Sequence, residues 1–113
     1  MDIYFIYLLR CRGGILYTGI TKDPARRFWE HFEKGARGAK FTRSHPAEKV
    51  EILWKTEGRQ AASRLEYRIK QLSKPQKERL IREPDCLQEL MGAKLEASVY
   101  TIITHPALKD NGK

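Results

Sequence analysis

Runs of apolar residues divide the first part of the chain into two expected strands. Residues 3–9 are almost continuously apolar and aromatic, which is typical of a central strand buried on both faces. The Gly-Gly pair at 13–14 favours a tight turn, because glycine adopts positive φ without penalty. Residues 15–20 are expected to fold back as the second strand of a hairpin. Tyr7 and Tyr17 are thereby brought near each other.

A helix is expected to begin at Pro24 and to run to about Lys34. Asp23 can cap its free backbone N–H groups, and proline fixes φ at the first helical position. Apolar residues at helical spacing predict the buried stripe, which consists of Ala25, Phe28, Trp29 and Phe32. The opposite side, where side chains are free to reach a ligand, is expected to carry Arg27, His31 and Lys34.

The middle of the chain adds a third strand and two helices. Residues 50–55 have partly alternating β character, and residues 59–72 have a helical apolar pattern. Glu66 lies about 100° round that helix from Leu65, off the centre of its core face. A short helix is expected from about Pro75 to Arg82, with Ser73 or Lys74 near its start. Four further aromatic residues are expected in the core or at its edge: Tyr4, Trp29, Trp54 and Tyr67.

The sequence signals weaken after residue 83. Residues 86–94 are compatible with a helix and residues 99–103 with a short strand, but their packing partners are not readable. We therefore expect one main domain over residues 1–83. Residues 84–113 form a C-terminal extension of uncertain structure that packs on this domain or trails from it.

Composition favours one basic domain. A chain of 113 residues with 41% hydrophobic content can build a single modest core. It has 22 Lys and Arg against 14 Asp and Glu, a formal net charge of +8, which suits a polyanionic partner such as nucleic acid. The excess lies in residues 1–83, with 19 basic against 10 acidic residues. A cationic surface that serves solubility explains the charge equally well.

Cysteine usage and the N-terminus indicate a cytoplasmic protein without membrane contact. Cys11 and Cys86 show no zinc-binding or disulfide spacing and are expected as free thiols in a reducing compartment. The first residues lack the basic and long apolar regions of a signal peptide. The apolar run at 3–9 is too short to cross a bilayer.

The loop at 35–46 combines basic residues, glycines and hydroxyls with an aromatic residue. Such a loop can approach phosphates closely, and Phe41 could stack on a base. Lys40, Thr42 and Arg43 are therefore predicted to hold a nucleic acid. A merely solvated connection is the alternative.

The order of these residues resembles the GIY-YIG endonuclease superfamily, in particular its small stand-alone bacterial members. Residues 5–7, Phe-Ile-Tyr, stand where the family has Gly-Ile-Tyr, and residues 17–19, Tyr-Thr-Gly, where it has Tyr-Ile-Gly. The capped helix with Arg27 and His31, and then Glu66, follow in the family's order. The resemblance covers about residues 3–82 and depends on this order more than on any single motif.

The resemblance implies an α+β fold, with a small three-stranded antiparallel sheet flanked by helices. It also implies a phosphodiesterase that acts on DNA with Mg²⁺ or another divalent cation such as Mn²⁺. The implied catalytic residues are Tyr7, Tyr17, Arg27, His31 and Glu66. Tyr7 would be the general base, Tyr17 would bind the phosphate or orient the water, and Glu66 would be the metal ligand. Nucleic-acid contacts would come from Gly19, Lys34, Lys40, Thr42 and Arg43.

Each assignment has a structural alternative. Glu66 can pair with Lys70 one turn later on a solvated helix face. Tyr7 and Tyr17 can pack their rings against the core, and Arg27 can pair with an acidic neighbour. His31 can donate to the phosphate or assist proton transfer, and a surface histidine without function is about equally plausible.

The leading hypothesis is a metal-dependent endonuclease, with a role such as DNA repair. A single compact domain has limited means of reading a long site, so we expect preference for branched, nicked or single-stranded DNA over sequence specificity. A nucleic-acid binding module that keeps the fold but cuts poorly, or not at all, is the main alternative. A small ribosome- or RNA-associated protein fits the charge equally well and the single carboxylate, Glu66, less well.

Overall fold

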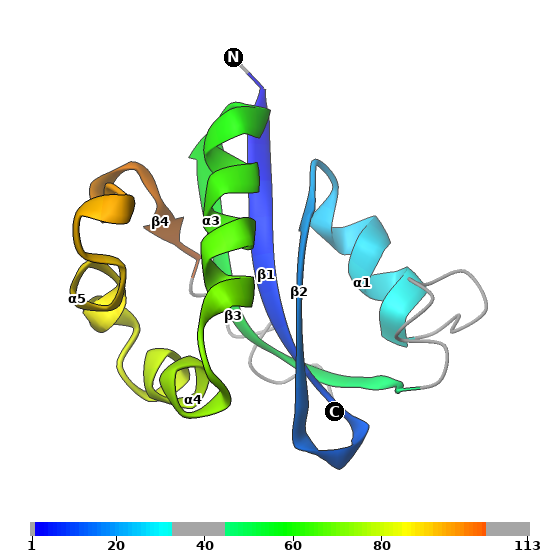
Figure 1. Ribbon diagram of the computed structural model, residues 1–113. Coiled ribbons are helices and arrows are strands. Elements are labelled where there is room, and N and C mark those ends of the chain that lie inside the picture. Colours follow the sequence, from blue (N-terminus) through cyan, green and yellow to red (C-terminus); the bar gives the residue numbers. More distant parts are fainter. Residues whose placement is uncertain (1, 33–44, 104–113) are drawn as a thin grey trace.

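The chain folds as an α+β domain with a four-stranded antiparallel sheet in the order β2-β1-β3-β4 (Figure 1). The computed structural model describes residues 2–32 and 45–103. The strands are β1 (Ile3–Cys11), β2 (Ile15–Thr21), β3 (Ala47–Glu57) and β4 (Thr101–Ile102). The helices are α1 (Pro24–Phe32), α3 (Arg59–Gln71), α4 (Lys74–Arg82) and α5 (Leu87–Met91). The predicted fold class is confirmed, with one correction: the sheet has a fourth strand, which the resemblance did not imply.

Strand β1 occupies the centre of the sheet, as its continuous apolar run predicts. It pairs with β2 on one side and with β3 on the other. The predicted hairpin is present, and Gly13 and Gly14 in its turn adopt φ of 82° and 78°. In the hairpin register, Tyr7 lies opposite Gly19, and Leu9 lies opposite Tyr17. Strand β4 pairs with β3 at only two positions.

The two faces of the sheet bear different cores, because successive residues of a strand point to opposite faces. The first core is built on Ile6, Leu8 and Trp54, and α3 packs on it. The second core contains Tyr7, Leu9, Cys11 and Leu53 from the sheet and Phe28 from α1. Helices α1 and α3 therefore belong to opposite faces.

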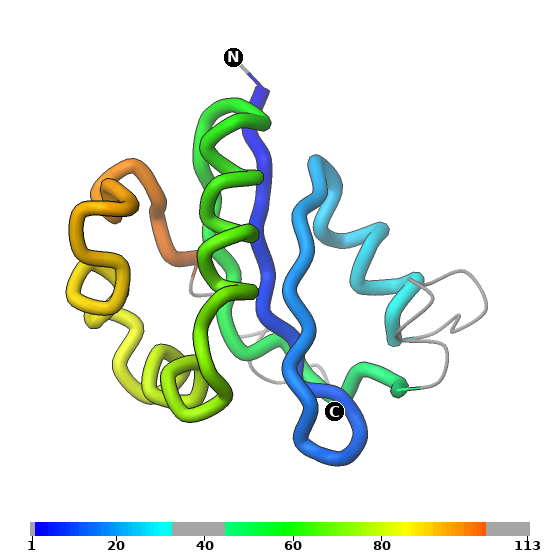
Figure 2. Tube along the Cα trace, in the orientation of Figure 1, coloured from blue at the N-terminus to red at the C-terminus, as the bar shows by residue number. Residues whose placement is uncertain are grey.

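The described residues after 83 pack against the first core. Cys86, Leu87, Met91, Leu95 and Tyr100 are buried within it. The hydroxyl of Tyr100 donates to the carbonyl oxygen of Ala61 in α3 at 2.7 Å. The trace shows α3 standing between this segment on one side and β2 and α1 on the other (Figure 2).

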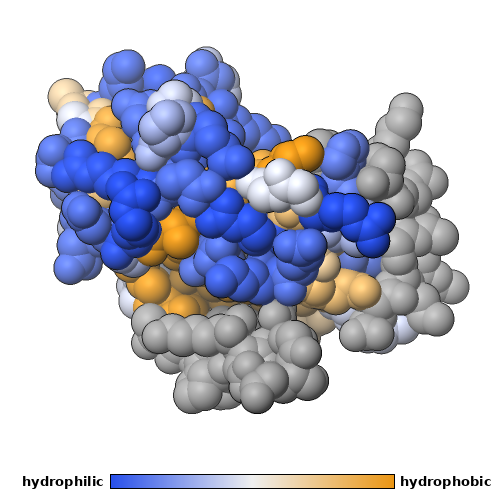
Figure 3. Space-filling model, turned by 90° about the horizontal axis from the view of Figure 1, so that it is seen from below, coloured by the Kyte–Doolittle hydropathy of each residue, from blue (hydrophilic) through white to orange (hydrophobic). Residues whose placement is uncertain are grey.

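Local signals in the sequence set the ends of the helices. Asp23 Oδ1 accepts from the backbone N–H of Arg26 at 3.1 Å, as expected of an N-cap. Ser73 and Gln76 form a reciprocal capping box at the start of α4. Among the described residues, no helix is long and apolar enough to cross a membrane. Hydrophilic residues cover most of the face shown in Figure 3.

Two of the aromatic residues that were expected in the core lie largely in solvent. Trp54 is fully buried and Tyr4 packs partly against the first core, as predicted. Trp29 is 46% exposed and Tyr67 is 56% exposed, so their prediction as core or core-edge residues is wrong. Each lies on the outer side of an amphipathic helix whose other residues supply the buried face.

Candidate active site

The ring of Tyr7 lies across the edge strand of the sheet, over Gly19. A Cβ atom built on Gly19 would overlap the Tyr7 hydroxyl and lie 2.5 Å from its Cζ. Only glycine therefore leaves room for the phenol at this position of β2. Gly19 is predicted to contact nucleic acid, and its steric relation to Tyr7 is a further role that the residue pattern did not predict. It places the Tyr7 hydroxyl over the outer strand, although Tyr7 itself lies on the central one.

His31 is buried beneath this phenol. It is 1% exposed, and its Nε2 lies 3.1 Å from the Tyr7 hydroxyl oxygen, within hydrogen-bond distance. The ring centroids of Tyr7 and Tyr17 each lie 5.6 Å from that of His31, and 6.5 Å from each other. Tyr7, Tyr17 and His31 thus form one cluster of rings, from three different elements.

The prediction that His31 lies on the solvent side of α1 is wrong, and so is the predicted burial of Ala25 and Trp29. The buried side of the helix carries Phe28 and His31, with Phe32 packed partly against the second core. The physical reason is the hydrogen bond between His31 and Tyr7. It satisfies a buried polar group and removes most of the cost of its burial. The apolar pattern alone could not reveal a partner 24 residues away.

Burial sets the protonation states of this pair. Burial and, to a lesser extent, the positive charge of Arg27 lower the pKa of His31 from its ordinary 6.5 to about 4, although Glu30 opposes the shift. Burial also raises the pKa of Tyr7 to about 12, while Arg27 opposes the shift through a hydrogen bond and its charge. At neutral pH both groups are therefore uncharged. In the tautomer with its proton on Nδ1, His31 accepts a hydrogen bond from Tyr7.

Arg27 is held between Glu30 and Tyr7. Its Nη1 donates to Glu30 Oε1 at 2.6 Å, and its guanidinium lies near enough to the Tyr7 hydroxyl for its charge to lower the pKa of that group. The ion pair with an acidic neighbour, given above as the structural alternative for Arg27, is therefore present with Glu30. The charge of Arg27 nevertheless acts on Tyr7 as well. A guanidinium has five donors in a planar fork, so it can also bind phosphate oxygens.

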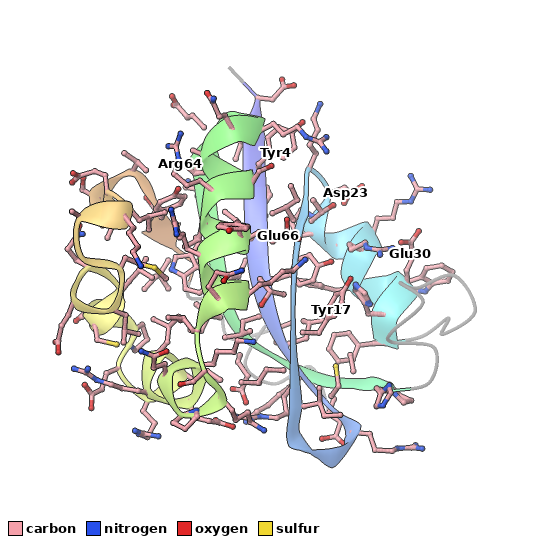
Figure 4. All side chains as sticks on the ribbon, in the orientation of Figure 1. Tyr4, Tyr17, Asp23, Glu30, Arg64 and Glu66 are labelled. Atoms are coloured by element: carbon pink, nitrogen blue, oxygen red, sulfur yellow. The ribbon has the colours of Figure 1, made fainter. Side chains whose placement is uncertain are left out.

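Glu66 comes from α3, on the other face of the sheet. Figure 4 shows Arg64 on the side of α3 that faces the C-terminal segment, and Glu66 away from that side, nearer to β2 and Tyr17. The side chain of Glu66 is 24% exposed, and its carboxylate lies 3.2 Å from Lys70 Nζ. Its negative charge contributes to the raised pKa of Tyr7. The carboxylate therefore pairs with Lys70 and also acts on the Tyr7 hydroxyl.

A divalent ion at this site would rely on few protein ligands. Among residues 2–32 and 45–103, no group of three or more His, Cys, Asp and Glu residues is arranged to hold a metal ion. Mg²⁺ keeps several waters and is usually bound by one or two carboxylates together with substrate phosphates. Glu66 fits this mode, because it is a single carboxylate that is partly exposed and whose charge acts on the Tyr7 hydroxyl.

The remaining predicted nucleic-acid contacts cannot be placed. Lys34, Lys40, Thr42 and Arg43 lie outside the described residues. A cavity of about 580 Å³ opens elsewhere, beside the start of α3. Its lining includes Lys55, Arg64, Glu96, Val99 and Tyr100 and none of the predicted site residues.

Comparisons with known proteins agree with the residue pattern. The model of the GIY-YIG catalytic domain matches residues 3–79. UPF0213 protein VC_A0739 of Vibrio cholerae is 53% identical over 79 residues, which cover 69% of this chain and 76% of that protein. UPF0213 protein FN1575 of Fusobacterium nucleatum is 43% identical over 82 residues, which cover 73% and 80%.

A solution NMR structure is also similar. It is that of UPF0213 protein BH0048 from Bacillus halodurans, with 33% sequence identity and a TM-score of 0.48. The match covers 80% of this chain and 94% of that one. The family model matches well over half of the chain, and its residues include the Tyr7 cluster and Glu66. The chain therefore belongs to the GIY-YIG family of nucleases, a family that acts on nucleic acids and generally uses divalent metal ions.

Proposed function

We propose that the protein is a metal-dependent endonuclease that hydrolyses phosphodiester bonds in DNA. The observation that carries the proposal is the position of the Tyr7 hydroxyl. It lies over the edge strand, is within hydrogen-bond distance of His31, and is affected by the charges of Arg27 from α1 and of Glu66 from the opposite face of the sheet. A purely structural tyrosine needs none of these three partners.

In this proposal, Tyr7 and His31 together accept the proton of the attacking water. A free phenolate is costly at neutral pH, because the pKa of Tyr7 is about 12. The cost is avoided if the Tyr7 oxygen takes the water proton while its own proton passes to His31 Nε2. The water loses one proton, and an imidazolium forms at His31. A bound phosphate adds negative charge nearby, which favours that imidazolium.

The other residues bind and orient the substrate. Arg27 would donate to two oxygens of the scissile phosphate, and Tyr17 would bind the phosphate or orient the water. Glu66 would hold the divalent ion, Mg²⁺ or Mn²⁺. When bound, this ion would neutralise charge on the phosphate and on the leaving oxygen.

The proposed substrate is DNA with an irregular structure, such as a branch, a nick or a single-stranded segment. The proposed holding residues are Gly19, Lys34, Lys40, Thr42 and Arg43. They offer phosphate contacts, which position a nucleic acid without reading its bases. A role in DNA repair would follow from this preference, and a cytoplasmic location is proposed from the free cysteines Cys11 and Cys86.

The test is an incubation of the purified protein with labelled branched, nicked, single-stranded and duplex DNA, with and without Mg²⁺ or Mn²⁺. Glu66→Ala and Tyr7→Phe are each expected to lower the cleavage rate by at least about a hundredfold. Glu57→Gln removes a carboxylate at the end of β3, and Tyr4→Phe removes a hydroxyl from the same strand as Tyr7. Both serve as matched controls and should cut like the wild type.

Two outcomes would contradict the proposal. Cleavage that persists in Glu66→Ala and Tyr7→Phe would remove these residues from the site. Binding without metal-dependent cleavage of any substrate would favour a binding module with the same fold. Matched RNA substrates at the same salt concentration separate DNA from RNA as the preferred nucleic acid.

A further inference from the structure

Tyr67 is an aromatic residue without a core to fill. It is 56% exposed, more than any other large hydrophobic residue among those that the structure describes. The core side of α3 consists of Ala62, Leu65 and Ile69, and helix geometry places Tyr67 on the opposite side. Burial therefore does not explain why an aromatic ring stands at this position.

Arg68 covers one side of the Tyr67 ring. Its guanidinium carbon lies 5.3 Å from the ring centroid, at the distance of a cation–π contact. Within the described residues, no carboxylate forms an ion pair with Arg68, and its buried Nε has no hydrogen-bond partner. By contrast, Arg10, Arg27 and Arg79 each pair with glutamates. Arg68 thus keeps its positive charge uncompensated beside an exposed aromatic ring.

Tyr67 is the member of this pair that is adjacent to the proposed metal ligand, because Arg68 lies about 160° round the helix from Glu66. Tyr67 directly follows Glu66, about 100° further round the same helix. A nucleic-acid strand whose phosphate lies at Glu66 would bring its neighbouring nucleotides toward the outer side of α3. Base–aromatic stacking and a nearby arginine are the usual means of holding such a strand.

We propose that Tyr67 and Arg68 form a stacking platform for an unpaired base of the DNA substrate, beside the phosphate that is cut. The platform rests on the proposed function for its place in catalysis, but the binding itself requires no cleavage. In a duplex the faces of the bases are already stacked, so only an unpaired base can use the ring. The overall charge of +8 and the uncompensated Arg68 complement the phosphates of such a strand. The platform would select DNA that is single-stranded next to the cleavage site.

The test is binding without metal, measured by fluorescence anisotropy in the presence of EDTA. The probes are a labelled DNA strand of about twelve nucleotides, the same strand in a duplex, and an RNA strand of the same sequence. Tyr67→Ala is expected to weaken binding of the single strand about tenfold and of the duplex less than twofold. Tyr67→Phe keeps the ring and should bind like the wild type. Val99→Ala alters another exposed apolar residue and serves as the matched control.

Several results would overturn the platform. They are unchanged binding of the single strand by Tyr67→Ala, equal losses for single strand and duplex, or no single-strand binding by the wild type. Unchanged binding would point to a protein interface at Tyr67, and a loss confined to RNA would exclude DNA. Circular dichroism verifies that each variant is folded. If Tyr67→Ala loses single-strand binding but the wild type cuts no DNA, the platform stands and the proposed nuclease activity fails.

Discussion

The two faces of the sheet show how one set of strands can serve both stability and chemistry. The α3 face carries Ile6 and Leu8 and is sealed by apolar residues from α3, α4 and the C-terminal segment. The α1 face carries Tyr7 and Leu9, which are their immediate neighbours in sequence, and encloses the buried His31. Each residue of β1 thus differs in environment from the next, because the side-chain period of a strand is two.

The difference between the faces is one of polarity. On the α1 face, the Tyr7 hydroxyl and His31 occupy space that apolar groups could fill, and they stay there because they bond to each other. Burial also moves both of their pKa values away from neutrality. A face built only for stability would not hold such a pair. We therefore assign the fold's stability mainly to the α3 face and its proposed chemistry mainly to the α1 face and the edge strand β2, to which α3 adds Glu66.

Substitutions that create a cavity in one of the two cores should have the largest effect and test the division of roles between the faces most directly. Leu80→Ala in the first core and Leu9→Ala in the second each remove a fully buried side chain, and each should cost about 2–5 kcal/mol of unfolding free energy. Only Leu9 lies in the core that contains Tyr7, so only Leu9→Ala should also lower cleavage per folded molecule. Chemical denaturation and cleavage assays at low temperature measure the two effects. An equal loss of specific activity in both variants would contradict the division.

Acid should destabilise the α1 face through His31. The pKa of His31 is about 4 in the folded protein and near its ordinary 6.5 in the unfolded chain. Between these pH values the unfolded state binds more protons, so stability falls as the pH falls from about 6.5 to about 4. This group alone accounts for up to about 3 kcal/mol.

Denaturation curves across this pH range, for the wild type and for His31→Gln, separate the contribution of His31 to the free energy of unfolding from that of the carboxylates. The variant should lose less stability than the wild type on acidification. Parallel curves would contradict the assignment of a buried, neutral histidine.

Gly19→Ala should have the smallest effect on stability and a large one on cleavage. The added methyl group overlaps the Tyr7 phenol, and such overpacking costs about 1–3 kcal/mol. The displaced hydroxyl would also lose its position at His31. In a chain that already carries Tyr7→Leu the overlapping ring is absent, so adding Gly19→Ala should cost little further stability. A loss of the same size from Gly19→Ala with and without the phenol would show that the strain has another source.

Much of the fold follows from local sequence signals. The Gly-Gly turn predicts the hairpin, and the apolar period of residues 59–72 and Ser73 predict the positions of α3 and α4. The hairpin register also predicts a contact that was not inferred from the sequence. A turn centred on Gly13 places Tyr7 opposite Gly19, so the contact between them could have been anticipated.

What could not be predicted depends on contacts between distant parts of the chain. The orientation of α1 is set by the bond from His31 to Tyr7, and a helical apolar pattern favours burial of Trp29 instead. Residues 99–103 are compatible with a short strand by sequence, but only Thr101 and Ile102 form one, and the pairing of this strand with β3 could not be predicted. The face of α3 that bears Glu66 follows from its helical period, but its approach to Tyr7 from the opposite face follows from the edge position of β2.

The fit of the Tyr7 ring over Gly19 also constrains how this sequence can vary. A larger residue at 19 is harmful while the phenol is present and harmless once it is gone, so the effect of one substitution depends on the other residue. The two positions are epistatic, although twelve residues separate them. A lineage that loses Tyr7 could then acquire a larger residue at position 19, and that residue would prevent a tyrosine from being regained at position 7. Loss of the tyrosine would thus become hard to reverse. A glycine at position 19 would indicate that a related chain still has room for the phenol.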